Sequence, residues 1–133
     1  MVIDASVLIA ILLDEPERSA FAEAIRRDEL RLVSAMTKLE VSMVMIARYD
    51  LEGAERVDRL LKTINATIVP FDEQQADIAR DAFARFGKGR HRAGLNFGDC
   101  ASYALAMAEA EPLLFKGTDF GVTDVVVAKG SPM

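Results

Sequence analysis

The chain is divided into short apolar runs and longer stretches in which apolar residues recur at helical spacing. The short runs have the length and composition of buried strands and occupy residues 2–4, 30–34, 66–71, 113–115 and 125–128. The helical stretches between them occupy residues 6–13, 17–28, 37–49, 53–64, 72–86 and 97–109. Strands that alternate with helices predict a three-layer α/β sandwich whose mainly parallel central sheet has about five strands.

Polar residues mark the expected starts of several helices. Ser6 and Asn96 are good N-caps. Residues 37–40 (Thr-Lys-Leu-Glu) and 72–75 (Asp-Glu-Gln-Gln) have the form of capping boxes. Glycines predict a loop at residues 87–94. With no internal repeat and no linker, residues 1–133 are predicted to form a single domain.

Composition narrows the class of protein. With 51% hydrophobic and 28% charged residues, the 133-residue chain is expected to fold rather than remain disordered. Its longest apolar run, residues 7–13, is far shorter than the roughly 18 residues of a membrane helix. One cysteine, Cys100, cannot form an internal disulfide and fits a reducing compartment. A cytoplasmic protein without a membrane segment is therefore expected.

The net charge of −5 argues against binding nucleic acid by bulk electrostatics. Any contact with nucleic acid would have to be local or assisted by bound cations. A cluster of metal-binding carboxylates would also produce an excess of acidic over basic residues. By itself, however, this excess indicates little more than solubility.

Four acidic residues lie where a parallel sheet gathers its ligand-binding groups. Asp4 ends the first strand, and Asp119 lies in the loop after the fourth strand. Glu40 and Asp99 are placed in the first turns of two helices. Since ligands bind at the carboxyl ends of parallel strands, the four side chains are expected to converge there. Each also has a local alternative: Asp4 as a helix cap, Glu40 as the return arm of a capping box, Asp99 as a helix-dipole partner, and Asp119 as a turn residue.

Convergence of these acids has an electrostatic consequence. Two carboxylates about 5 Å apart repel by about 3 kcal/mol at an effective dielectric constant near 20. A cluster without basic neighbours would therefore take up protons, splay apart or bind a cation. Oxygen-only ligands favour Mg²⁺ or Mn²⁺ over zinc, and such ions activate water for phosphodiester hydrolysis.

Segments around these acids resemble PIN-domain nucleases, and in particular toxins of the VapC type. The similar segments appear in the family's order at residues 2–6, 38–41, 96–104 and 114–125. The resemblance implies a Mg²⁺-dependent endoribonuclease that forms a homodimer and is inhibited by a cognate antitoxin protein. It also implies that the metal is bound by the four acids, Asp4, Glu40, Asp99 and Asp119.

The same resemblance extends to supporting residues. It implies that the hydroxyls of Ser6 and Thr118 support the metal or the phosphate. Thr118 stands where many relatives carry Asn or Asp. Asp124 is a further candidate as an outer ligand, with a cap of the following strand or a local bond to Thr123 as its alternatives.

A basic loop precedes the helix that carries Asp99. Its charged residues include Lys88, Arg90 and Arg92, which are predicted to hold an RNA backbone. A solvated surface loop is the alternative.

We interpret Cys100 as a packing residue rather than a nucleophile. The methionine-rich helix 37–49 has apolar residues on more than one face. Most of these residues are expected to pack in the core, and the remaining ones are a candidate surface for a dimer or for an antitoxin helix.

Three other functions use a similar fold. A phosphatase of the haloacid-dehalogenase type would need an acid where Ser6 stands. A phosphoreceiver domain would need a phospho-acceptor Asp at the end of the third strand, which is occupied by Pro70 and Phe71. A non-catalytic interaction module remains open, and it would tolerate Asp-to-Asn changes that inactivate a nuclease.

Overall fold

The central sheet of the computed structural model, which describes residues 1–131, contains four strands instead of about five. All pairs are parallel and the order is β3-β2-β1-β4. The strands are β1 (Val2–Ile3), β2 (Leu32–Ser34), β3 (Thr67–Val69) and β4 (Leu113–Leu114).

The predicted fifth strand at 125–128 is wrong. Only Val127 pairs with the sheet, through an isolated bridge to Leu113. Beyond that point the Phe115 N–H donates to the Ser131 hydroxyl at 3.0 Å, so a side chain replaces the next rung of the ladder. The preceding segment forms a short 3₁₀ helix, η1 (Phe120–Val122).

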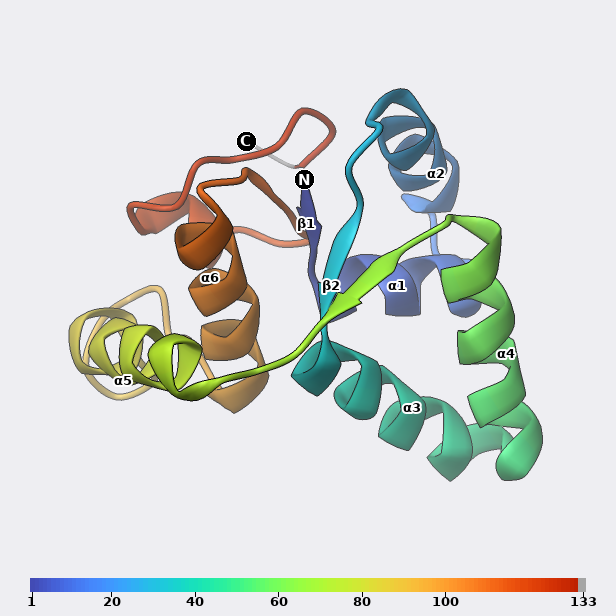
Figure 1. Ribbon diagram of the computed structural model, residues 1–133, viewed down its shortest axis with the longest axis horizontal. Helices are drawn as coiled ribbons and strands as arrows, with labels where there is room; N and C mark the ends of the chain where they lie inside the picture. Colours follow the sequence, from blue (N-terminus) through green and yellow to red (C-terminus); the bar gives the residue numbers. More distant parts are fainter. Residues whose placement is uncertain (132–133) are drawn as a thin grey trace.

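Six α-helices surround the sheet among the described residues. Their bounds are α1 (Ala5–Leu12), α2 (Arg18–Arg27), α3 (Ala35–Tyr49), α4 (Leu51–Thr63), α5 (Glu73–Phe86) and α6 (Phe97–Glu109). In Figure 1, α5 and α6 lie on one side of the sheet, and α1, α2 and α4 lie on the other. α3 continues directly from the end of β2 (Figure 1). The predicted α/β class with a parallel sheet is thereby confirmed.

Three helices, α1, α3 and α4, begin one or two residues earlier than the sequence pattern suggested. α1 is capped by Asp4 rather than Ser6, because the Asp4 carboxylate accepts the Ser6 N–H. α3 is capped by Ser34, so the predicted capping box at residues 37–40 is wrong. Thr37 is instead buried inside the helix, and Glu40 lies in the second turn rather than the first. The Asp72 cap and the Asn96 cap are confirmed. The predicted box at residues 72–75 is only half formed, because the Gln75 amide donates to the Pro70 carbonyl and its oxygen does not accept the Asp72 N–H.

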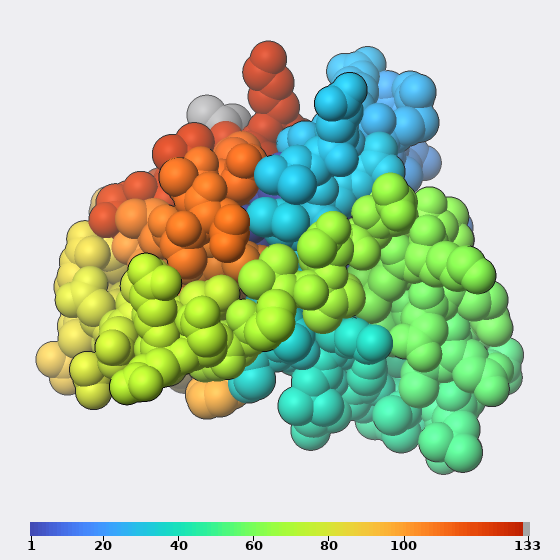
Figure 2. Space-filling view, in the orientation of Figure 1, coloured from blue at the N-terminus to red at the C-terminus, as the bar shows by residue number. Residues whose placement is uncertain are grey.

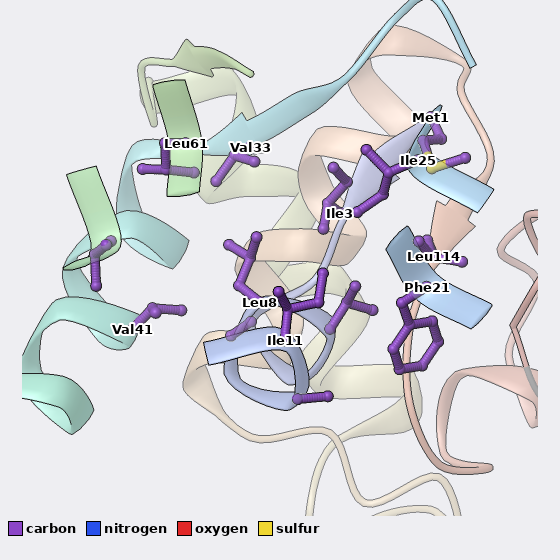
Figure 3. Packing of buried hydrophobic residues seen from close by; sticks show 14 of the residues in the cluster. Met1, Ile3, Leu8, Ile11, Phe21, Ile25, Val33, Val41, Leu61 and Leu114 are labelled. Carbon is purple, nitrogen blue, oxygen red and sulfur yellow. The ribbon is translucent and has the colours of Figure 1, made fainter. Parts of the chain in front are cut away.

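Alternating strand residues divide the core between the two faces of the sheet. Ile3, Val33 and Leu114 pack against α1, α2, α3 and α4, as Figure 3 shows in part. Their strand neighbours Val2, Leu32 and Leu113 belong to a second cluster with α5 and α6. Burial of each such side chain contributes about 1.5–3 kcal/mol. The two cores therefore fix the sheet between its helical layers.

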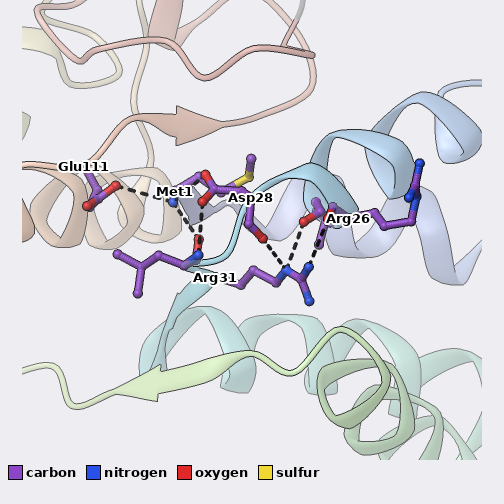
Figure 4. Close-up of polar contacts among 7 residues, drawn as sticks. Met1, Arg26, Asp28, Arg31 and Glu111 are labelled. Atoms are coloured by element: carbon purple, nitrogen blue, oxygen red, sulfur yellow. Dashed lines mark hydrogen bonds and ion pairs between the residues drawn. The ribbon is translucent and has the colours of Figure 1, made fainter.

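The amino-terminal edge of the sheet is fastened by ionic contacts (Figure 4). The Met1 amine donates to the Asp28 carboxylate at 3.0 Å and to the Leu30 carbonyl at 2.7 Å, and it lies 3.4 Å from the Glu111 carboxylate. The Arg31 guanidinium nearby donates to four main-chain carbonyls. These contacts join the starts of β1, β2 and β4.

The strand β3 forms one edge of the sheet and reaches the surface. In Figure 2 its segment crosses the front of the molecule between the α4 and α5 sides. Within residues 1–131, every helix is too short or too polar to cross a lipid bilayer.

Candidate active site

Asp4 is held rigidly at the carboxyl end of β1. Only 3% of the residue is exposed. Its Oδ2 accepts hydrogen bonds from the Ser6 N–H at 3.1 Å and the Ser6 hydroxyl at 2.6 Å. The Ser6 oxygen in turn accepts the Lys116 N–H at 2.9 Å. Asp4 is therefore both a helix cap and a fixed acid beside the end of β4, which unites the two roles considered for it.

Glu40 reaches from α3 across to the first turn of α6. Its carboxylate lies directly against the Gly98 backbone, where a Cβ atom would collide with both carboxylate oxygens. Burial raises the pKa of Glu40, and the nearby charges of Asp4 and Asp99 raise it further. Asp4 and Asp99 therefore lie within electrostatic range of the Glu40 carboxylate.

Asp99 occupies the third position of α6, within a complete capping box. Its N–H donates to the Asn96 side chain at 2.9 Å, and its Oδ2 accepts the Asn96 N–H at 3.0 Å. Burial raises the pKa of Asp99 to about 6 against the lowering effect of the Asn96 hydrogen bond, and the charges of Asp4 and Asp119 add to the rise. Asp119 is exposed and directly precedes η1, and its side chain makes no capping hydrogen bond there. All four predicted acids thus approach one edge of the sheet.

Protein cations do not neutralise this group. Among residues 1–131, none of the four acids forms an ion pair with Lys or Arg. The Lys116 ammonium, although its main chain contacts Ser6, binds Glu15 at 2.8 Å and Glu17 at 3.0 Å. The carboxylates consequently experience their mutual repulsion without compensation.

The four acids are close without forming a closed ligand cage. Within the part of the chain that the structure describes, no group of three or more acidic, His or Cys side chains is arranged to hold a metal ion. The donor set is nevertheless composed of carboxylate oxygens, the ligand type of Mg²⁺ and Mn²⁺. Gly98 leaves room for Glu40 beside Asp99, and the raised pKa values show two acids that lack a counter-charge. The residues fit a hard divalent cation by chemistry and charge.

The other predicted polar residues are distributed differently. Thr118 is exposed in the loop that carries Asp119. Asp124 accepts a hydrogen bond from the Tyr103 hydroxyl at 2.6 Å and one from Arg85 at 2.9 Å. Both of its oxygens are thereby engaged with α5 and α6, and the loop after Asp119 is fastened to those helices. Its predicted local bond to Thr123 does not form within the described chain, because the Thr123 hydroxyl donates to the Phe120 carbonyl.

The basic loop presents its charges to solvent. Lys88, Arg90 and Arg92 are all exposed. The loop itself is closed by a hydrogen bond from the Lys88 N–H to the Leu95 carbonyl at 2.9 Å, and Arg90 donates to the Ala84 carbonyl at 3.0 Å. It leads directly into α6, so its position relative to Asp99 is restricted.

Cys100 follows Asp99 but points into the core. It is 5% exposed, and burial raises the pKa of its thiol to about 11, with the Asp99 charge contributing. The thiol is therefore protonated at neutral pH, which confirms the interpretation as a packing residue.

The methionine-rich helix divides as expected between core and surface. Met45 is fully buried, whereas Met43 and Leu39 are 62% and 53% exposed. Leu39 and Met43 line an apolar groove beside Glu40, and the exposed side chain of Phe97 lines both this groove and a second one on the α5 side. Phe97 is 77% exposed although Cys100 and Ala101, three and four residues later, are buried, so helical spacing alone would have placed it in the core.

Known proteins similar to this chain point to the same family. The family model described as the PIN domain matches residues 1–126. The chain belongs to the PIN-domain family. It is 48% identical over 125 residues to a Mycolicibacterium smegmatis protein named Ribonuclease VapC, with 94% of this chain and 97% of that protein covered. It is 47% identical over 125 residues to Ribonuclease VapC30 of Mycobacterium tuberculosis, with 94% and 95% covered.

Solved structures share the fold of this PIN domain at low sequence identity. VapC20 of Mycobacterium tuberculosis, described as a sarcin-ricin loop cleaving toxin, superposes with a TM-score of 0.76 at 12% identity over 94% of this chain and 95% of that one. VapBC2 from Rickettsia felis, solved with a promoter DNA fragment, gives 0.76 at 10% identity over 95% and 94%. A toxin–antitoxin complex from Klebsiella pneumoniae gives 0.72 at 20% identity over 96% and 95%.

Proposed function

We propose that this PIN domain is an endoribonuclease that hydrolyses RNA phosphodiester bonds and serves as the toxin of a toxin–antitoxin pair. The observation that carries the proposal is the convergence of Asp4, Glu40, Asp99 and Asp119 without a protein counter-charge. Relatives named ribonucleases, 47–48% identical over 94% of the chain, support the same activity. A phosphatase, a phosphoreceiver domain and a non-catalytic module are not favoured by these similarities.

The proposal includes Mg²⁺ or Mn²⁺ as the ion, held by the same four acids. When bound, such an ion supplies an activated water and stabilises the negative charge that develops on the phosphodiester. The chemistry of the donor set supports this choice, because oxygen ligands and hard divalent cations match. A cation is attracted to the unpaired carboxylates, and its binding also relieves their mutual repulsion.

The remaining site residues orient the acids and the substrate. Ser6 holds Asp4 through its N–H and its hydroxyl, and the Asn96 box holds Asp99. We assign the RNA backbone to Lys88, Arg90 and Arg92, whose exposed charges attract phosphates toward the acidic edge. Thr118 offers a hydroxyl to the phosphate from the Asp119 loop.

Partners and location complete the proposal. Structural neighbours that were solved as toxin–antitoxin complexes support a cognate antitoxin protein as the inhibitor. The exposed apolar residues of α3, including Leu39 and Met43, supply surface for that antitoxin or for a homodimer. We place the protein in the cytoplasm, where its RNA substrate and reducing conditions for Cys100 occur.

Incubation of the purified protein with total RNA tests the proposal. Cleavage is expected with Mg²⁺, is abolished by EDTA, and returns when Mg²⁺ is added back. Asp99→Asn, which keeps the hydrogen bonds of the helix cap, is expected to be inactive under all conditions. Asp72→Asn makes the same change at the cap of α5, outside the site, and is expected to cleave normally. EDTA-resistant cleavage, or an active Asp99→Asn, contradicts the proposal.

A further inference from the structure

Two buried hydroxyls join the helices that carry Glu40 and Asp99. The Thr37 hydroxyl of α3 and the Ser102 hydroxyl of α6 are 3.3 Å apart, within hydrogen-bond distance, although 65 residues separate them in sequence. Thr37 is 1% exposed and Ser102 is 0% exposed. Both side chains are buried, so the hydrogen bond between them is a directional link inside a layer of otherwise apolar contacts.

The spacing of these hydroxyls relates them to the acids. Thr37 lies three residues before Glu40 on α3, and Ser102 lies three residues after Asp99 on α6. Residues three apart share a helix face, so each hydroxyl lies one turn from an acid on the same side of its helix. The interface between α3 and α6 therefore has the two hydroxyls at its buried side and the two acids one turn away.

Gly98 supplies the second point of contact between the helices. The Glu40 carboxylate packs against its backbone, and any side chain there would displace it. Two contacts about one turn apart fix both the axial position and the rotation of α3 relative to α6. A helix advances about 1.5 Å per residue, and a misplacement of about 1 Å at a reacting centre costs about a hundredfold in rate.

Stability alone does not require hydroxyls at these positions. Replacement of both members of a buried hydrogen-bonded pair by apolar groups of the same shape is nearly neutral. An apolar pair would fix the relative position of α3 and α6 less precisely. Packing contacts tolerate small shifts between helices, whereas a hydrogen bond depends on distance and angle.

We infer that Thr37 and Ser102 are positioning residues that hold Glu40 beside Asp99 and so set the affinity of the acidic cluster for divalent cations. The inference rests on the proposed function. Both hydroxyls are buried, so they would act through Glu40 and Asp99 rather than by direct contact with the ion or the RNA. Outer-shell groups of this kind typically change metal affinity by about 10–100-fold when they are removed.

Titration with Mn²⁺, followed by electron paramagnetic resonance of the free ion, tests the inference. Thr37→Val keeps the shape of the side chain and is expected to weaken Mn²⁺ binding about tenfold. Thr37→Ser restores the hydroxyl and is expected to restore the affinity. Ser42→Ala removes a hydroxyl that donates to the Lys38 carbonyl on the same helix, and it is expected to bind Mn²⁺ like the wild type.

Combination of variants separates positioning from packing. If the hydroxyls act as one unit, Thr37→Val with Ser102→Ala weakens Mn²⁺ binding no more than the worse single variant. RNA cleavage is expected to show a lower kcat with an unchanged KM at sub-saturating Mn²⁺. Should the thermal transition show that Thr37→Val does not fold, Ser102→Ala, which removes the other hydroxyl of the pair, carries the same measurement.

The outcomes distinguish the inference from the function on which it rests. A wild type that binds no Mn²⁺ overturns both. A wild type that binds Mn²⁺, together with Thr37→Val and Ser102→Ala variants of equal affinity, overturns the positioning role alone. A Thr37→Ser variant as weak as Thr37→Val also overturns it, since the hydroxyl would then be irrelevant.

Discussion

Carboxylates at the two edges of the same parallel sheet have opposite surroundings. At the amino-terminal edge, Asp28 and Glu111 lie 3.0 and 3.4 Å from the Met1 amine. Although burial raises the pKa of Asp28, hydrogen bonds from the Leu30 N–H and the Met1 amine hold it below its usual range. At the carboxyl edge, burial and neighbouring acids raise the pKa of Glu40 and Asp99.

The difference separates structural acids from functional ones. An acid paired with a cation stabilises the fold at neutral pH, whereas unpaired acids destabilise it. A cluster of the second kind persists in a folded protein when other contacts hold it, as the α6 capping box holds Asp99. The carboxyl edge is therefore where a cation from solution has most to contribute.

The largest expected effect is on RNA cleavage by matched Glu-to-Gln changes at the two edges. Glu40→Gln removes a charge from the site and is expected to lower kcat/KM by about a hundredfold or more, because bound metal contributes several kcal/mol to the transition state. Glu111→Gln makes the same change beside the Met1 amine and is expected to leave kcat/KM unchanged. Steady-state cleavage of a defined RNA measures both, and equal losses would remove the distinction between the edges.

Folding stability is expected to change next, through Asp99. Because the folded pKa of about 6 exceeds the usual 3.8, the charge of Asp99 penalises folding above about pH 6, and this penalty disappears below about pH 4. After allowance for solvent screening it amounts to about 2 kcal/mol. Metal-free wild type should therefore gain stability between about pH 7.5 and 5, and Asp99→Asn should gain less and be more stable at pH 7.5.

Urea unfolding in EDTA measures this effect at both pH values. Asp72→Asn provides the control, since it alters another acidic helix cap outside the cluster. If the free energy of unfolding depends on pH in the same way for wild type and Asp99→Asn, the charge of Asp99 does not destabilise the fold.

Asp28 is expected to behave in the opposite way. Asp28→Asn removes the nearer of the two carboxylates beside the buried Met1 amine, and the free energy of unfolding at neutral pH is expected to fall by about 1–2 kcal/mol. Cleavage per folded molecule should stay constant. Chemical denaturation combined with the RNA assay checks both expectations. A more stable Asp28→Asn variant would show that the Asp28 charge destabilises the fold, as is expected for the unpaired acids.

The smallest effect concerns the basic loop. Arg85 is paired with Asp81 and Asp124, whereas Lys88 and Arg92 form no ion pair within residues 1–131. Arg92→Gln is expected to reduce the salt-dependence slope of RNA binding by about 0.7, the value for one phosphate contact on a single strand. Lys62→Gln, at the exposed end of α4, should leave the slope unchanged. Fluorescence anisotropy across a salt series in EDTA measures it, and equal slopes would exclude the loop from RNA binding.

Much of the site could be predicted because its residues follow strands. Asp4 and Asp119 were located by the rule that parallel strands end at one edge, and that rule needs only local patterns. The cap of α3 was misplaced because Thr37 and Glu40 satisfy a capping pattern locally, while burial of Thr37 against Ser102 is decided by α6. Sequence reasoning ignores such partners.

Long-range contacts also explain the other differences. The partners of Asp124 lie 21 and 39 residues away, so no local pattern reveals them. The apolar residues 125–128 have strand composition, but Val126 is 67% exposed and the Ser131 hydroxyl takes the next donor of β4. Strand propensity is overridden there by a side-chain hydrogen bond.

Isothermal titration with Mn²⁺ tests the central claim that the unpaired acids form a cation site. The wild type and Glu111→Gln are expected to bind Mn²⁺ with equal affinity, and Glu40→Gln is expected to bind it at least about tenfold more weakly. Equal binding by all three proteins, or no binding by the wild type, would contradict the account.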